Sequence, residues 1–410
     1  MQRPPSSPGW NRMSFDPFDP SQQSRHHDVM AELRRSCPVA RLSSGMIVIS
    51  RYEDVRSALN EPRMRNSHSA RAPGVAVPPA DRLFFFEYDP PEHLQLRRVM
   101  VDLLSRQRAE RQGPVIRDLV LELMGPLLDA GGGELVGQLS IPLAGRLMML
   151  VTGFPEADAG RWRQWIKDMV VTGFSFTNRN ARGVGLEQCY PDLLAYLDRH
   201  LAERATAAQP PDDVLTRVVN VRLDSTPLTQ THRRMILFSV VSAGTNTLVN
   251  FVSNTLLSLA RDPALVDTLR GDRSLLPAAV EESLRRDSPS MYITRTCVEP
   301  TEVGGTMIVP GEKLLLGLAS ANRDSASYLQ PDEFHLDRES QPPHLAFGWG
   351  SHLCLGAWLA RQTGITLLDT FLDRVAAISL ERGSVPVPYL SPQGNGLDEL
   401  RVRLTALALR

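Results

Sequence analysis

The stretch FGWGSHLCLGAWLAR, residues Phe347–Arg361, places Cys354 in a glycine-rich turn immediately before an apolar segment with helical spacing. Gly348 and Gly350 permit tight backbone geometry that a Cβ atom would forbid, and Gly356 permits the close approach of a flat partner. The free N–H groups at the start of a helix favour an anion. We therefore expect the pKa of the Cys354 thiol to be lowered and its thiolate to be stabilised.

A thiolate in such a turn has three candidate roles. It is a nucleophile if a histidine base lies nearby, a ligand that pushes electron density onto haem iron, or a buried structural cysteine, which is the common state of a lone free cysteine. Phe347 can shield the sulfur from water, and His352 and Arg361 supply donors for anionic groups. The other three cysteines are scattered without a CxxC pair, which argues against a disulfide framework or a structural zinc site.

The composition is that of a globular protein with a large core. The chain has 410 residues, of which 42% are hydrophobic and 22% charged, and it shows no internal linker or repeat, so we expect one domain over residues 1–410 with an extended segment at 1–20. The net charge of −1 argues against nucleic acid as a partner. Lys167 and Lys313 are the only lysines, so 43 of the 45 basic residues are arginines, as in high-GC bacteria. We expect no signal peptide and no membrane anchor, and a cytoplasmic location.

Helical periodicity dominates the chain. The expected helices cover roughly 26–37, 53–60, 92–104, 114–130, 139–152, 158–173, 188–206, 230–261, 275–287 and 355–373. The longest of these, 230–261, lacks charge from Met235 to Leu259 and is expected to cross the interior. Short strands are expected near 46–50 and over 291–316, followed by a polar meander.

The cysteine turn resembles the haem-binding loop of the cytochrome P450 family. FGWGSHLCLG matches the family pattern F-G-x-G-x-H-x-C-x-G at every specified position. The resemblance implies a mainly α fold with a small β region, in which haem b (iron protoporphyrin IX) lies between the long central helix and the helix of the cysteine loop. It also implies that Cys354 is the thiolate ligand of the iron and that His352 hydrogen-bonds a haem propionate. Further cofactor contacts implied by the resemblance are Phe347, Gly348, Gly356 and Ala243.

Other motifs follow in the order that the family has. Glu282 and Arg285 stand three apart in EESLRRDSP, and such a pair is ordinarily a solvated ion pair. In the family, this pair is buried beneath the haem and tied to an arginine of the meander, here Arg338. By the same resemblance the remaining propionate ligands are His93, Arg97 and Arg295.

The long helix departs from the family pattern at one position. The family has Ala-Gly-x-(Asp/Glu)-Thr above the iron, where the acid and the alcohol organise waters that deliver protons to oxygen, whereas this chain has Ala243, Gly244, Thr245, Asn246 and Thr247. An amide can hold water but cannot cycle a proton near neutral pH. Three interpretations of Asn246 follow. It positions waters while another group, such as the substrate, relays protons; it marks oxidative coupling or another atypical reaction; or it merely slows an ordinary hydroxylase. Gly244 costs helix stability and is expected to leave room for oxygen.

The resemblance also predicts the walls of a mostly apolar substrate pocket. We expect a lid at 165–190, and aromatic groups near the distal side from the loop at 62–88. The predicted pocket residues are Phe84, Phe85, Phe86, Val240, Val241, Ser290, Met291, Tyr292, Ile293 and Tyr389.

These features predict a P450 oxidoreductase that activates O2 to hydroxylate a mid-sized apolar or aromatic secondary metabolite. Electrons are expected from a separate ferredoxin and ferredoxin reductase, with Arg361 facing an acidic partner. The alternative reaction is oxidative C–C or C–N coupling of aromatic substrates such as tryptophan-containing cyclic dipeptides. A non-enzymatic alternative is a haem-thiolate sensor.

Overall fold

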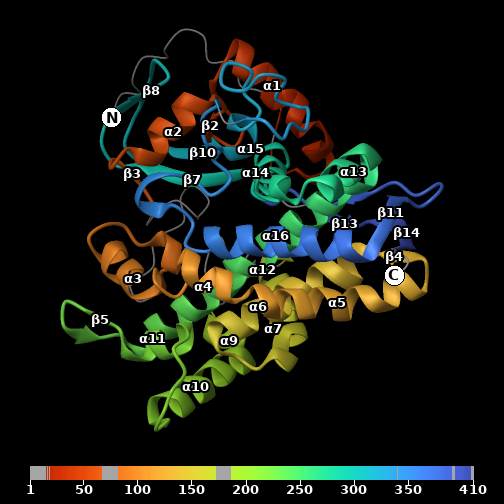
Figure 1. Ribbon diagram of the computed structural model, residues 1–410. Coiled ribbons are helices and arrows are strands. Elements are labelled where there is room, and N and C mark those ends of the chain that lie inside the picture. Colours follow the sequence, from red (N-terminus) through yellow and green to blue (C-terminus); the bar gives the residue numbers. More distant parts are fainter. Residues whose placement is uncertain are drawn as a thin grey trace.

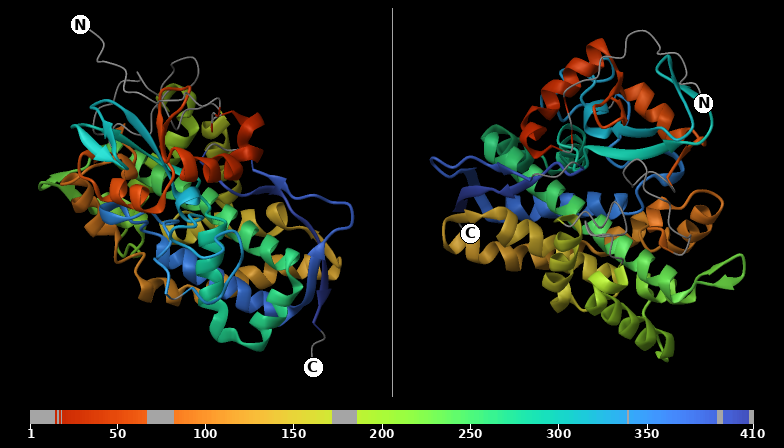
Figure 2. Two further views of the ribbon diagram at one scale, coloured as in Figure 1. Left: turned by 90° about the horizontal axis from the view of Figure 1, so that it is seen from above. Right: turned by 180° about the vertical axis from the view of Figure 1, so that it is seen from behind.

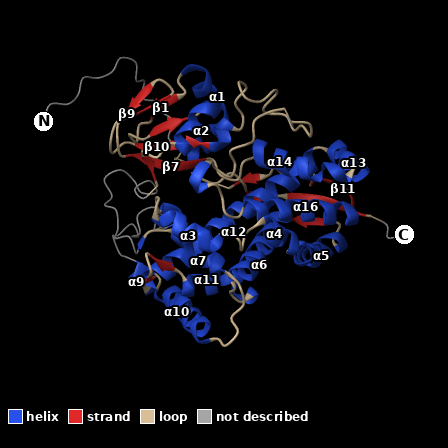
Figure 3. Ribbon diagram, turned by 60° about the vertical axis from the view of Figure 1, so that its left-hand side comes forward, coloured by secondary structure: helices blue, strands red, loops and turns tan. Residues whose placement is uncertain are grey.

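The computed structural model describes residues 15, 17, 19–66, 82–171, 186–338, 340–389 and 393–407. Helices make up most of the molecule, and a smaller region of strands lies at one side (Figures 1 and 3). The predicted mainly α fold with a small β region is therefore confirmed. Most of the segment at 1–20, the loop residues 67–81, and residues 172–185 of the expected lid lie outside the described residues.

Helix α12, Gln230–Arg261, is the central element of the fold. The Thr229 side chain accepts a hydrogen bond from the His232 N–H at its start, and Asp262 ends it and caps the next helix, α13. α12 packs against α6 and α14, and Figure 1 shows it passing behind α16. By length and composition α12 could cross a membrane, although we expected no such segment. However, 61% of its most apolar window is buried inside the protein, as in the core helix of a globular fold.

Most of the remaining helices pack around α12, whereas α1, α2 and α15 lie in the β region (Figures 1 and 2). Their bounds are α1 His26–Ser36, α2 Tyr52–Asn60, α3 Glu92–Met100, α4 Arg106–Arg111, α5 Gly113–Asp129, α6 Ile141–Thr152, α7 Ala159–Val171, α9 Leu186–Cys189, α10 Pro191–Thr206, α11 Val214–Asn220, α13 Pro263–Gly271, α14 Leu276–Arg286, α15 Leu318–Ala321 and α16 Ala357–Arg374. The largest hydrophobic cluster joins α5, α6, α12, α14 and α16, and a second cluster joins α7, α10 and the first half of α12.

A five-stranded sheet of order β1-β2-β10-β7-β3 forms the β region. Strands β2 and β10 are parallel and the other pairs are antiparallel, with Arg295 of β7 opposite Leu314 of β10. These strands are β1 Val39–Arg41, β2 Ile47–Ile49, β3 Met64–Arg65, β7 Tyr292–Cys297 and β10 Lys313–Gly317. The smaller sheets contain β4 Gly132–Glu134, β5 Arg222–Leu223, β6 Thr226–Pro227, β8 Thr301–Val303, β9 Thr306–Ile308, β11 Val375–Leu380, β12 Val387–Pro388, β13 Leu397–Glu399 and β14 Arg401–Ala406.

Candidate active site

The cysteine loop has the tight backbone that its glycines predicted. Gly348 and Gly350 both adopt positive φ values, +71° and +72°, which favour glycine. The Cys354 N–H donates to the Phe347 carbonyl oxygen at 2.9 Å, closing the loop three residues before α16 begins at Ala357. The loop thus holds the sulfur at a fixed place beside the start of α16.

The environment of the Cys354 thiol differs from the prediction in one respect. The Gly356 N–H and the guanidinium groups of Arg97 and Arg361 favour the thiolate, but burial is the larger effect and raises the pKa of the thiol. The predicted lowering of the pKa is therefore wrong for the protein alone. Cys354 nevertheless keeps accessible surface, although much of the protein surrounds its sulfur.

A second accessible surface lies on α12. Ala243 and Thr247 are exposed although residues on the other faces of this central helix are buried. The two residues are four apart, so they lie on one face of the helix. The Thr247 hydroxyl donates to the Ala243 carbonyl oxygen at 2.7 Å and keeps its lone pairs for a further donor. Asn246 lies about 100° around the helix from Thr247.

The structure gives Gly244 a different role from the one expected. A Cβ atom built on Gly244 would lie 2.5 Å from Sδ of Met148 on α6. A side chain at position 244 would thus collide with Met148, and glycine lets α6 and α12 approach closely. Close packing of these two helices therefore favours glycine here, and the room for oxygen at Gly244 stays a prediction.

Four predicted anion-binding side chains gather near the cysteine loop. The imidazole rings of His93 and His352 stack with centroids 3.8 Å apart. Burial lowers the pKa of His93 to about 4 and that of His352 to about 3, and the guanidinium groups of Arg97 and Arg295 add to both shifts. Nδ1 of His93 and Nε2 of His352 are buried without a hydrogen-bond partner, and Arg295 is only 4% exposed.

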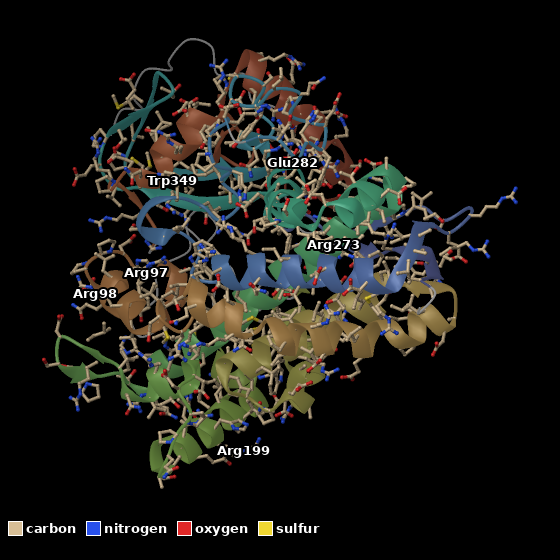
Figure 4. The ribbon with its side chains drawn as sticks, in the orientation of Figure 1. Arg97, Arg98, Arg199, Arg273, Glu282 and Trp349 are labelled. Atoms are coloured by element: carbon tan, nitrogen blue, oxygen red, sulfur yellow. The ribbon has the colours of Figure 1, made fainter. Side chains whose placement is uncertain are left out.

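Below the loop, Glu282, Arg285 and Arg338 form the predicted buried triad. The Glu282 carboxylate accepts from Arg285 Nε and Nη2, both at 2.7 Å, and from Arg338 Nε at 2.8 Å. Glu282 and Arg285 are only 3% and 2% exposed, and the two arginines donate further to carbonyl oxygens of the meander. Figure 4 shows Glu282 on α14, on the β-region side of α16.

Comparisons with known proteins agree with this geometry. The family model for cytochrome P450 matches residues 192–387. Cyclomarin C epoxidase CymV of Salinispora arenicola is 30% identical over 376 residues, covering 90% of this chain and 93% of that protein. The chain belongs to the cytochrome P450 family. P450 monooxygenase PikC of Streptomyces venezuelae is likewise 30% identical, over 86% of this P450 and 83% of PikC. A solved structure of an EryK mutant with erythromycin B superposes with a TM-score of 0.84 at 27% identity, covering 95% and 99% of the two chains.

Family membership makes this P450 a haem-dependent monooxygenase, and the residues present fit a haem. Cys354 and the Ala243–Thr247 face both keep accessible surface, against which a flat ring would lie. A Cβ atom on Gly356 would meet nothing closer than the Cys354 sulfur, at 3.9 Å, so this glycine leaves space beside the sulfur. The buried, unpartnered nitrogens of His93 and His352 and the buried Arg295 suit carboxylate groups, which would satisfy their hydrogen bonds and balance their charge.

Arg361 does not face a protein partner as predicted. It donates to both carboxylate oxygens of Glu281 at 2.7 and 2.9 Å, and its guanidinium lies 4.7 Å from the ring centroid of Phe347. His344 approaches the same carboxylate at 3.3 Å. Arg361 therefore connects Glu281 of α14 with Phe347 of the cysteine loop. The sequence signal for this second cluster is the doubled glutamate at 281–282.

Several predicted pocket residues belong to the core instead. Val241 is fully buried, and Phe84 and Phe85 pack in the cluster under α12, where the Phe85 N–H donates to Ser239 Oγ. Met291 and Tyr292 pack beneath α1, and the Tyr292 hydroxyl lies 2.9 Å from Nδ1 of His26. These side chains are packed in the core because alternate strand residues and neighbouring helix residues point to opposite sides. Their contact with a substrate stays a prediction. Phe86, Val240, Ser290, Ile293 and Tyr389 are partly or largely accessible.

The structure also contains a pocket that the sequence did not reveal. A cavity of about 430 Å³ lies on the flank of α12, between α6, α7 and β13. Its walls include Asn246 and Asn250 of α12, Tyr389, and Asp398. The chain between α6 and β13 is too long for sequence spacing to have placed these groups together.

Proposed function

We propose that this P450 hydroxylates a mid-sized, largely apolar secondary metabolite, using haem b held by Cys354. The observation that carries this proposal is the buried cluster of His93, His352 and Arg295, which has unpartnered ring nitrogens and one guanidinium charge, together with the accessible surfaces of Cys354 and of Ala243 and Thr247. When bound, the haem supplies the redox chemistry that activates O2.

The chain's own residues have separable roles in this proposal. His93, Arg97, Arg295 and His352 bind the haem carboxylates, and Phe347 and Gly356 leave the sulfur shielded but accessible to the ring. The triad of Glu282, Arg285 and Arg338 fixes the meander and with it the cysteine loop. Thr247 and Asn246 hold water on the α12 side, where protons must arrive.

The names of the relatives support the substrate class. They include an erythromycin C-12 hydroxylase and a 6-deoxyerythronolide B hydroxylase of Saccharopolyspora erythraea. The side chains of Phe86, Val240 and Ile293 keep accessible apolar surface. We expect a substrate that fills such a site mainly by apolar contact and is oriented by few polar groups.

The outer surface of the cysteine loop and of the start of α16 supports a ferredoxin as the electron donor. Leu353 and Trp358 are 41% and 43% exposed, and the Arg106 guanidinium lies 5.4 Å from the Trp358 ring centroid. Arg98 is exposed on the neighbouring α3, beside Arg97 (Figure 4). An apolar centre with basic residues around it suits an acidic partner. In this proposal the P450 is a single domain in the cytoplasm. A separate ferredoxin and ferredoxin reductase supply its electrons.

The first experiment is a titration of the purified ferric protein with a panel of metabolites, in which the position of the Soret absorption band is measured after each addition. A high-spin shift with macrolides or other apolar scaffolds, and a hydroxylated product with a ferredoxin system, is expected. A shift only with tryptophan-containing cyclic dipeptides, and a dimeric product, would replace hydroxylation by oxidative coupling. Absence of a Soret band from protein expressed with ample haem would overturn the assignment of Cys354.

A further inference from the structure

The cavity of about 430 Å³ on the flank of α12, called the flank pocket here, meets this helix beside the face that carries Ala243 and Thr247. Thr245, Asn246, Val249 and Asn250 line it. By helical spacing, Thr245 and Val249 point away from the face that carries Ala243 and Thr247, whereas Asn250 lies beside that face. Since each residue turns an α-helix by about 100°, Asn246 lies between these two directions. Its amide can therefore contact water in the pocket and water near Thr247.

The charged groups around the pocket come from several elements. Glu156, before α7, pairs with Arg146 of α6, which also donates to Glu122 at 2.7 and 2.9 Å. Arg163 and Lys167 lie on the exposed side of α7. Asp398 of β13 lines the pocket and, among the residues described here, has no ion-pair partner within 4 Å.

We propose that Asp398 relays protons from solvent, through the flank pocket and the water held by Asn246, to the oxygen-activating side of α12. This inference rests on the proposed monooxygenase function. Asp398 would supply, from across the pocket, the carboxyl group that the helix lacks at position 246. It acts through Asn246 and water, so it is a positioning residue rather than a catalytic one.

The pocket has the properties that a proton path needs. Its volume of about 430 Å³ holds several waters, and its polar walls from Asn246, Asn250, Tyr389 and Asp398 offer them partners. Asp398 is exposed to solvent, so it can regain a proton from bulk water. The protein atoms on one side of Asp398 partly desolvate its carboxyl group and raise its pKa, against the opposing effect of Lys167 and Arg163. The protonated form is thus more populated than for an ordinary aspartate.

The proton balance is simple. One hydroxylation consumes O2, the substrate C–H bond, two electrons from the redox partner and two protons, and yields the alcohol and one water. For each proton, the Asp398 carboxyl gives H⁺ to a pocket water, the proton passes along hydrogen-bonded water beside Asn246, and bulk water restores the carboxyl. Asp398 itself is neither oxidised nor reduced.

The test compares Asp398→Asn with the wild-type holoenzyme and with Glu399→Gln, a neighbour on β13 whose carboxylate pairs with Arg401. We expect Asp398→Asn to lower product formation at least about tenfold, to raise the share of electrons lost as peroxide, and to enlarge the solvent isotope effect. Asp398→Glu and the double variant Asn246→Asp/Asp398→Asn should restore coupling, since each returns a carboxyl to the path. Glu399→Gln should behave as wild type.

A second readout requires no turnover. Carbon-13 NMR of labelled aspartate carboxyl groups should show a pKa for Asp398 above that of an ordinary aspartate. We expect this pKa to be higher still in Asn246→Asp, where a second carboxylate faces the same pocket. Unchanged coupling and isotope effect in Asp398→Asn, with wild type active, would overturn the relay. Failure of the proposed hydroxylation would instead appear as wild type that oxidises no metabolite, and the coupled titration would still decide whether positions 246 and 398 share one pocket.

Discussion

In the proposed function, cofactor binding depends on the side chain of Cys354. We expect Cys354→Ser to lose the thiolate-type Soret band of the reduced, carbon monoxide-treated protein, because a hydroxyl remains protonated and does not push electron density onto iron. Cys189→Ser, at a half-buried cysteine of α9, is the control and should keep the band. A thiolate-type band in Cys354→Ser would assign the ligand to another residue.

The Glu282 triad permits a stability prediction for a single buried charge. Glu282→Gln removes the carboxylate that neutralises Arg285 and Arg338, and leaves their charges without a partner in a nearly inaccessible place. We expect a loss of about 3–5 kcal/mol in the free energy of unfolding, measured by chemical denaturation. Glu302→Gln, at an exposed site on β8, should change stability by less than about 0.5 kcal/mol.

Single residues show where sequence reasoning succeeded and where it failed. The contacts of Glu282, Arg285 and Arg338 could be predicted because a motif fixes their spacing and their partner. The direction in which the pKa of Cys354 shifts could not be predicted. It depends on how far burial, which raises the pKa, outweighs the Gly356 N–H and the two guanidinium groups that lower it. Arg361 was misplaced because a sequence does not tell an arginine on the surface from one that pairs with Glu281.

At the level of elements, the contact between α6 and α12 is decided by Gly244. Gly244→Ala would ordinarily stabilise a helix by about 1 kcal/mol, but here the new methyl group would meet Met148. We expect a net destabilisation of about 1–3 kcal/mol. Met148→Ala removes the side chain that the new methyl group of Gly244→Ala would meet. We therefore expect Gly244→Ala to cost less stability in that background, so that a double-mutant cycle shows coupling between the two sites. Additive effects would show that the helices do not touch at this point.

The long elements were predictable and the short ones were not. α5, α6, α10, α12 and α16 have apolar residues at helical spacing over many turns, and their observed bounds lie within a few residues of those expected. The short helices α11 and α13, and the sheet of order β11-β14-β4, were missed. Their formation depends on partners distant in sequence, such as Arg401 of β14 opposite Glu134 of β4.

For the whole molecule, the Glu281 cluster predicts sensitivity to acid. Burial would raise the pKa of Glu281, but hydrogen bonds from His344 and Arg361 outweigh it and lower the pKa to about 2. A depressed pKa adds stability above the ordinary glutamate range, and this stability is lost as the pH falls towards 2.

The Glu281 side chain is 42% exposed, so solvent screening limits its contribution to about 1 kcal/mol. The measurement is the difference in unfolding free energy between wild type and Glu281→Gln as a function of pH. We expect this difference to be largest near about pH 6 and to shrink below about pH 4. A difference that stays constant through this range would show that the carboxylate is not stabilised by its neighbours.

The stacked rings of His93 and His352 join parts of the chain that leave the ribosome far apart in time. His93 emerges in the first quarter of synthesis, whereas His352 and Cys354 emerge near its end, and a chain folds from its N-terminal side as it grows. Helices α1 to α14 are therefore synthesised before Cys354, the proposed iron ligand, whereas α16, which completes the largest core cluster around α12, follows it. Haem capture must be among the last steps of maturation, so haem shortage should leave a nearly folded apoprotein rather than an unfolded chain.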